Sequence, residues 1–229
     1  MKLVNKLSIA GQPFTLVDRD VRLSLSTPAR ANFTVMGTPP TQGLVEYAFG
    51  YSSMGPVQDF FLGYVERVTP IDSKHSKVFC RELSASLAVD LPLSLRNVTM
   101  KDVLAKVTET MGLTFNIPNA AYADVKAANF INLGSGYLVM DTLAQVYQIP
   151  NFIWQQQTNG KIYAGSWDDS HWHNKIAVIP TSFLSRQLSN QSAQIAPIPT
   201  LRPGAELNDN RVTDVRLQSN AMVITWKPQ

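Results

Sequence analysis

The spacing of apolar residues changes along this chain, and that change most limits what the chain can fold into. Across residues 3–87, apolar side chains recur at every second position, which is the period of β-strands. Within residues 94–167, two segments follow the period of an α-helix instead, and each leads into an apolar run that ends in a turn. The sequence therefore predicts a mixed β-rich (α+β) fold, with a compact α+β unit containing two short helices in the middle of the chain.

The first helical segment has both of its ends marked. Thr99 is followed three residues later by Asp102, a loose capping box in which side chains satisfy the free N–H groups of the first turn. Gly112 stands where a left-handed residue closes a helix at least cost. The apolar stripe between these ends consists of Val103, Leu104, Val107 and Met111. Residues 113–117 then alternate and stop at Pro118, which predicts a short strand.

The second helical segment repeats the pattern D-x-L-A-x-V. Residues 134–136 open it, and Pro150 ends it because a residue before proline avoids the α region. Leu143 corresponds to Leu104 of the first segment, so we expect both leucines to be buried against the same small sheet. The short match leaves a duplication open. After this segment, Asn-Gly at 159–160 separates two alternating runs, which predicts a hairpin.

The N-terminal third predicts a small closed barrel or sandwich. Turn signals recur between short alternating segments, as is typical of such folds. The expected strands are at 7–11, 20–26, 32–36, 43–50, 60–70 and 77–87. Gly63 lies inside the longest of them, which indicates a bulge or a barrel corner. No residues in this region have the spacing of a catalytic motif.

The C-terminal third contains short strands and turns. Apolar runs at 177–180 and 183–184 precede a polar stretch, 185–194, which we expect to be an exposed loop. Pro-Gly at 203–204 indicates a turn. Two alternating runs then flank a polar turn and predict a terminal hairpin formed by residues 211–217 and 222–226.

The composition favours a component of a protein assembly. Only 16% of the 229 residues are charged, against about 25% in ordinary globular proteins. Much of the surface must therefore be uncharged and polar, which suits contact with other proteins. The net charge is +3, but a nucleic-acid footprint needs basic residues gathered on one face. Here they are spread along the chain and interleaved with acids, so no specific nucleic-acid partner is expected; examples are Arg19, Arg22, Arg30, Arg67 and Arg81.

The single cysteine and the length of the apolar runs indicate in which compartment the chain folds and whether it spans a membrane. Cys80 lies in an apolar strand pattern, where a thiol behaves as a small buried hydrophobe. One cysteine cannot form an internal disulfide, and zinc needs about four ligands. The first residues lack the apolar region of a signal peptide. No stretch approaches the ~18 apolar residues of a membrane span. We expect folding in a reducing cytoplasm without a membrane span.

Several short motifs occur in an order that resembles a known family. The first helix is entered as LRNVTMKDVL and followed by G-L-x-F, a second helix and the hairpin FIWQQQTNGKIYAG. Residues 61–68 fit F-x-G-x-V-x-x-V, and PTLRPGAEL precedes RVTDVRL near the C-terminus. This order is similar to that of the late-control-D-like baseplate or tail hub proteins of tailed bacteriophages. That family is related in architecture to the hub part of type VI secretion spikes.

The resemblance implies a domain organisation. It implies two small β-barrel-like domains separated in sequence by the α+β part and packed together in space. The expected domains are an N-terminal barrel at 1–90, an α+β domain at 91–168, and a short C-terminal barrel or hairpin region at 169–229. The last region has room for only four or five strands. Either the second barrel is abbreviated, or strands from both ends of the chain share one sheet.

The resemblance also implies a structural function. The chain is expected to be a tail hub of the virion, joining the end of the tail tube to the tail tip or spike as a homotrimeric ring. Implied partners are the distal tail or tube protein, the tape measure protein and the tip or spike. The protein would be made in the host cytoplasm. Two alternatives stay open, a cell-wall-degrading enzyme and a carbohydrate-binding module of the tail tip.

The candidate catalytic and metal-binding residues are few. His171 and His173 are two residues apart, a spacing that places two ligands on one face of a strand, but residues 168–174 read as a polar loop. Asp168 and Asp169 beside them have no nucleophile in a recognisable context. Two further acids, Glu66 and Glu82, are of the type that forms glycosidase pairs, although such acids are more often solvated or ion-paired. We therefore predict no catalytic residue, no metal and no cofactor.

The aromatic residues give the candidate interface. Trp167 and Trp172 flank the polar loop, so we expect them to be exposed and to anchor a partner, because aromatic side chains dominate interface hot spots. Most other large aromatics, among them Tyr147, Trp154 and Trp226, are expected in the core.

Overall fold

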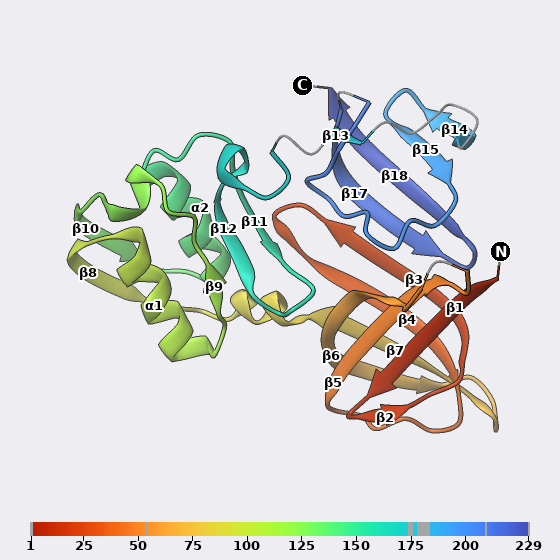
Figure 1. The fold of residues 1–229 in the computed structure, drawn as a ribbon. Helices are drawn as coiled ribbons and strands as arrows, with labels where there is room; N and C mark the ends of the chain where they lie inside the picture. The colour runs from red at the N-terminus through yellow and green to blue at the C-terminus, as the bar shows by residue number, and fades with distance from the viewer. Residues whose placement is uncertain (1, 54, 174–175, 178–183, 209, 229) are drawn as a thin grey trace. The chain divides into compact units, whose positions relative to one another are not determined.

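The computed structural model describes residues 2–53, 55–173, 176–177, 184–208 and 210–228. The chain divides into two compact units. The first unit combines Met1–Glu82 with Lys175–Gln229, and the second is Leu83–Asn174. Figure 1 shows the sheet strands of the first unit and the helices of the second. No helix among the described residues is long and apolar enough to cross a membrane.

The first unit is built on one 13-stranded sheet that contains strands from both ends of the chain (Figure 1). Its N-terminal strands are β1 (Leu3–Ile9), β2 (Gln12–Pro13), β3 (Leu16–Ser24), β4 (Thr27–Met36), β5 (Leu44–Tyr51), β6 (Gln58–Pro70) and β7 (His75–Glu82). Its C-terminal strands are β13 (Ile176–Ala177), β14 (Leu184–Ser189), β15 (Ser192–Ile195), β16 (Glu206–Leu207), β17 (Asn210–Gln218) and β18 (Ala221–Pro228). The strand order is β14-β15-β18-β17-β3-β4-β7-β6-β5-β1-β2. Outside this order, β16 pairs with β17, and β13 pairs with β16.

The contact between β3 and β17 decides between the two arrangements left open by the sequence. These strands pair antiparallel from Asp214 opposite Ser24 to Gln218 opposite Asp20. Strands from both ends of the chain therefore share one sheet. The prediction of a mixed β-rich class is confirmed, but the prediction of a closed barrel is wrong. β3 pairs with β17 on one side and with β4 on the other. Among the described residues, the strands therefore follow one another in an open order and do not close into a ring.

The inner face of this sheet is filled by the predicted period-two residues. Val21 and Leu23 are buried, as expected. An aromatic cluster packs beside them, with ring centroids 5.1 Å apart for Phe33 and Tyr47 and 4.9 Å apart for Phe49 and Phe60. Such tilted and edge-on contacts are the arrangements that aromatic rings prefer.

Gly63 has a different role from the one predicted. It is paired regularly with Val45 on one side and Glu82 on the other, and the two register shifts in β6 lie elsewhere, between Asp59 and Phe61 and between Val65 and Arg67. A Cβ at position 63 would collide with the carbonyl group of Arg81. Glycine is therefore explained here by close backbone approach rather than by a bulge at the residue itself.

Two predicted segments differ from the structure. The strand expected at 77–87 ends at Glu82, and Leu83–Ala88 forms a 3-10 helix, because Leu87 turns into the core of the second unit. The exposed loop expected at 185–194 is the β14–β15 hairpin. The terminal hairpin is confirmed as β17–β18. The apolar run predicted at 178–180 and residue 183 lie outside the described residues.

The second unit places two helices against two small sheets. Its elements are β8 (Leu93–Val98), α1 (Met100–Met111), β9 (Phe115–Asn116), η2 (Ala121–Asp124), β10 (Ala127–Asn132), α2 (Gly136–Val146), β11 (Phe152–Gln156), β12 (Ile162–Ser166) and η3 (Trp167–Asp169), preceded by η1 (Leu83–Ala88). The capping box is confirmed: the Thr99 hydroxyl accepts from the Asp102 N–H at 3.2 Å, and Asp102 accepts from the Thr99 N–H at 2.8 Å. Gly112 is left-handed, with φ of 70°. The hairpin pairs β11 with β12.

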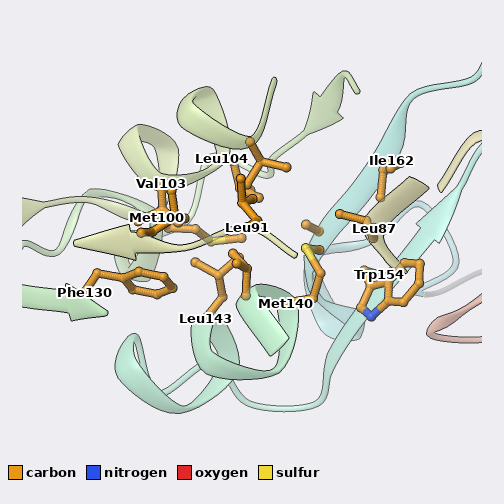
Figure 2. Packing of buried hydrophobic residues seen from close by; sticks show 14 of the residues in the cluster. Leu87, Leu91, Met100, Val103, Leu104, Phe130, Met140, Leu143, Trp154 and Ile162 are labelled. Atoms are coloured by element: carbon orange, nitrogen blue, oxygen red, sulfur yellow. The ribbon is translucent and has the colours of Figure 1, made fainter. Parts of the chain in front are cut away.

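One hydrophobic cluster holds the second unit together (Figure 2). Leu104 of α1 and Leu143 of α2 are both buried in it, as predicted, together with Phe130 of β10. The repeated D-x-L-A-x-V pattern does not give equal environments, however. Val107 is fully buried, whereas its counterpart Val146 is 38% exposed.

Candidate interaction surfaces

The polar loop that contains the predicted site begins at η3 and is held by its own carboxylates. Asp168 accepts hydrogen bonds from Asn151 Nδ2 at 2.9 Å and from the Ser166 hydroxyl at 3.2 Å. Asp169 accepts one from the hydroxyl of Tyr122 at 2.9 Å. Burial raises the pKa of Tyr122 to about 12, and its bond to Asp169 acts in the same direction. Both carboxylates therefore have structural partners within the second unit.

The two histidines of the loop contact tryptophans. His171 is exposed, and its ring centroid lies 3.9 Å from that of Trp172. His173 meets Trp167 edge-on at 5.4 Å. Among the described residues, no group of three or more His, Cys, Asp or Glu side chains is placed to hold a metal ion.

The structure separates the two tryptophans proposed as interface residues. Trp167 is only 4% exposed, and its backbone N–H donates to the carbonyl of Asn151 at 2.9 Å. The prediction that Trp167 is exposed is therefore wrong. The reason is that η3 turns this side chain inward at the end of β12. Trp172 is partly exposed, and its N–H donates to the Ser170 hydroxyl at 3.2 Å. Of the two, Trp172 alone can present its ring to a partner.

The other candidate catalytic residues do not meet. Glu66 is exposed and paired with Arg81 at 3.5 Å, whereas Glu82 is buried and accepts from the Ala29 N–H at 2.8 Å. Because Arg81 and Glu82 are consecutive in β7, their side chains point to opposite faces of the sheet. The two carboxylates therefore do not flank one site. Burial raises the pKa of the Cys80 thiol to about 12, which removes it as a nucleophile at neutral pH.

An exposed apolar surface in the second unit was not predicted. Leu133, between β10 and α2, is 86% exposed. Asn132 fixes this loop by donating from Nδ2 to the carbonyls of Leu91, Gly134 and Ser135 at 2.7, 2.9 and 3.2 Å. We call the exposed surface around this loop the Leu133 patch; it consists of Val89, Ile131, Leu133 and Leu138. Exposed apolar side chains that gather in one place are typical of an interaction site.

One indirect signal for this patch is present in the sequence. An apolar Leu133 directly before the Gly-Ser-Gly at 134–136 has no place in either a strand or the helical stripe that follows. Next to this loop, the first residue of α2 contacts the segment that follows η1: the Gly136 N–H donates to the carbonyl of Val89 at 3.1 Å. That contact joins segments far apart in the sequence.

Comparison with known proteins identifies the fold. No family model matches the chain. The solved structure of the 43 kDa tail protein of prophage MuSo2 from Shewanella oneidensis matches over 98% of both chains, with a TM-score of 0.73 and 9% identity. The chain has the fold of phage tail proteins. The tail protein of Neisseria meningitidis MC58 shares this phage tail fold over 100% of this chain and 97% of its own, with a TM-score of 0.69 and 8% identity.

The same fold occurs in a component of a secretion system, and a phage protein is similar to the chain in sequence. The E. coli c3393 protein is a type VI secretion component described as similar to the T4 tail proteins gp27 and gp5. It matches 97% of this chain and 76% of its own, with a TM-score of 0.60 and 14% identity. An uncharacterized 58.7 kDa protein of Haemophilus phage HP1 is 29% identical over 98% of this chain. The chain spans 42% of that relative's length. These neighbours are of the class that the sequence motifs indicated.

Proposed function

We propose that the chain is a structural component of a phage tail, namely a hub that joins the end of the tail tube to the tail tip or spike. The observation that carries this proposal is the match to the MuSo2 tail protein, which extends over 98% of both chains. The separation of the candidate catalytic carboxylates supports a role as a surface rather than as an enzyme.

The proposed partners are other tail proteins and further copies of the chain. The distal tail or tube protein, the tape measure protein and the tip or spike are the neighbours that such a hub requires. The exposed Leu133 patch and the partly exposed Trp172 give the second unit surfaces suited to such contacts. The proposed location is the tail tip of the virion, after synthesis in the host cytoplasm.

The test is to locate the chain in particles of the phage that encodes it. Gold-labelled antibody against the chain should mark the end of the tail away from the head in electron micrographs. Label on the head, label along the whole tube, or absence of the chain from purified particles would contradict the proposal. Clearing of a peptidoglycan gel by the purified chain would favour the cell-wall-degrading alternative, and retention on a glycan array would favour the carbohydrate-binding one.

We expect the purified chain to associate with itself into a trimer. The low charged fraction and the exposed apolar residues on both units leave surface that another protein can cover. Light scattering should give a mass three times the 25.4 kDa of one chain. A 25.4 kDa particle at every concentration would count against the ring.

We expect Trp172→Ala to weaken tail assembly more than the combined change His171→Ala and His173→Ala. Loss of a desolvated aromatic anchor costs about 2 kcal/mol or more at an interface hot spot. The measurement is the yield of complete, infective particles. Trp167→Ala is the control, because loss of this buried ring should lower the stability of the isolated chain. Normal particles that have lost infectivity in the double-histidine variant would instead indicate a metal or catalytic role.

A further inference from the structure

Four arginines between residues 22 and 216 form one row across four neighbouring strands. Arg216 of β17 is directly opposite Arg22 of β3, Arg22 is opposite Arg30 of β4, and Arg30 is opposite Arg81 of β7. We call these four residues the arginine row. The same line continues through Tyr64 of β6, opposite Arg81, to Leu44 of β5.

The arginine row lies on the outer face of the sheet. Directly paired residues point to the same side, and their sequence neighbours on the other side are buried in the core: Val215, Val21, Leu23, Ala29, Ala31 and Cys80. All four arginines are partly or fully exposed, and Leu44 at the end of the line is 54% exposed. With strands about 4.8 Å apart, the line from Arg216 to Leu44 is roughly 24 Å long.

The row carries more positive charge than its neighbours neutralise. Arg216 makes two hydrogen bonds of 2.8 Å to Asp20, while Arg22 lies 3.9 Å from Asp214. Arg81 is paired with Glu66. Arg30, between Arg22 and Arg81, has no ion pair among the described residues.

Like charges directly opposite each other on neighbouring strands destabilise a sheet. The field of the row is visible in the lowered pKa of Asp20, caused first by its hydrogen bond from Arg216, with Arg22 and Arg30 contributing. A carboxylate placed over Arg30 would be attracted by three guanidinium groups at once. Arginine and tyrosine are also residues that dominate interface hot spots.

The charges of the two units differ in sign. Residues 83–174 contain seven Asp and Glu against five Lys and Arg, which is a net charge of −2. The whole chain has 20 Lys and Arg against 17 Asp and Glu. Residues 1–82 and 175–229 therefore contain fifteen basic and ten acidic side chains, a net charge of +5.

The second unit offers a surface that complements the arginine row. Asp90 follows Val89 of the Leu133 patch, and Asp141 lies on the exposed side of α2, three residues after Leu138. Both surfaces thus combine charged and apolar side chains. The second unit has carboxylates beside the Leu133 patch, and the first unit has arginines in line with Tyr64 and Leu44.

We propose that the arginine row is the docking surface for the second unit of another copy of this chain, with Asp141 approaching Arg30 and the Leu133 patch covering Leu44. This inference rests on the proposed ring and names the surfaces that form it. Because the two surfaces differ, the contact is head-to-tail, and such contacts produce a ring when the rotation closes. Nucleic acid is the less fitting occupant, because three of the four arginines are already paired with acids, whereas a phosphate backbone needs a cluster of unpaired basic side chains on one face.

The experiment is a charge swap in the full chain, with self-association measured by sedimentation equilibrium. We expect Arg30→Glu to weaken association at least tenfold, because it places like charges at the contact. Asp141→Lys should do the same, and the two changes together should restore most of the loss. Lys77→Glu is the matched control. It makes the same charge change at an exposed residue of β7 outside the row and should leave association unchanged.

Four results would overturn the docking surface. The first is wild-type association by an Arg30→Glu chain whose circular dichroism confirms folding, and the second is a double variant no better than either single one. The third is binding of a fluorescent DNA duplex by the wild type but not by Arg30→Glu, which would assign the row to nucleic acid. A wild-type chain that stays monomeric also overturns it, and detection of that chain at the tail tip would leave the tail role standing.

Discussion

Replacing Leu104 or Leu143 with alanine should lower the free energy of unfolding of the second unit by about 2–5 kcal/mol. Each leucine is buried in the cluster that joins α1, α2 and the small sheets (Figure 2). Loss of these methyl groups removes apolar surface from the core and leaves a cavity that the surrounding helices can only partly close. The measurement is urea unfolding followed by circular dichroism, with hydrogen exchange assigning the loss to residues 83–174.

The repeated D-x-L-A-x-V pattern supplies a matched control for this experiment. Val107 and Val146 occupy the same place in the two copies, but only Val107 is buried. Val107→Ala should therefore destabilise the chain measurably, and Val146→Ala should change the free energy of unfolding by no more than about 0.5 kcal/mol. Losses below about 0.5 kcal/mol for both leucine variants would mean that the helices are not packed as described.

Features set by neighbouring residues could be predicted from the sequence. The capping box at Thr99 and Asp102, the left-handed Gly112 and the hairpin around residues 159–160 each depend on side chains within a few positions. Their physical causes are local, so the pattern of residue types is sufficient. The same holds for the alternation in β3, where burial follows the period of two.

Features set by partners far away in the sequence could not be predicted. The end of β7 at Glu82 depends on where Leu87 finds a core, and the inward position of Trp167 depends on the turn of η3 after β12. The arginine row is the clearest case. Its members lie between residues 22 and 216, and only the registers of β17 with β3, β3 with β4 and β4 with β7 bring them together. Pairing between the two ends of the chain leaves no local signal.

Replacing Arg202 with methionine should destabilise the first unit by about 3–5 kcal/mol. Arg202 is buried beside β6, where Nη2 donates to the carbonyl of Phe60 at 2.5 Å and the guanidinium lies 5.7 Å from the ring centroid of that residue. Burial lowers the pKa of Arg202, and the nearby charge of Glu82 opposes that shift. Removing the guanidinium leaves Glu82, itself buried, without that positive charge. Urea unfolding of Arg202→Met, with Arg202→Lys as the charge-retaining control, measures the effect.

Replacing Arg19 with methionine should not lower the stability of the first unit, although Arg19 is also a buried arginine of that unit. Arg19 is 5% exposed, and its Nε and Nη2 atoms have no acceptor among the described residues. Its guanidinium carbon lies 6.0 Å from the centroid of the Tyr47 ring. A buried guanidinium with two unpaired N–H groups is costly, so methionine, which keeps the apolar stem, should leave stability unchanged or raise it by about 1–4 kcal/mol.

Comparing the two variants tests what decides whether removal of a buried guanidinium lowers or raises the free energy of unfolding. The deciding factor is either the partners of the guanidinium or its burial alone. Both variants remove one guanidinium from the interior of the first unit and differ in what remains behind. Arg202→Met leaves the carbonyl of Phe60 without this donor and the buried carboxylate of Glu82 without the nearby positive charge, whereas Arg19→Met removes two donors that have no acceptor. If Arg19→Met lost as much stability as Arg202→Met in the same urea titration, the stem packing or the contact with Tyr47 would outweigh the missing hydrogen bonds. Burial alone would then be the better guide to the effect of removing either guanidinium.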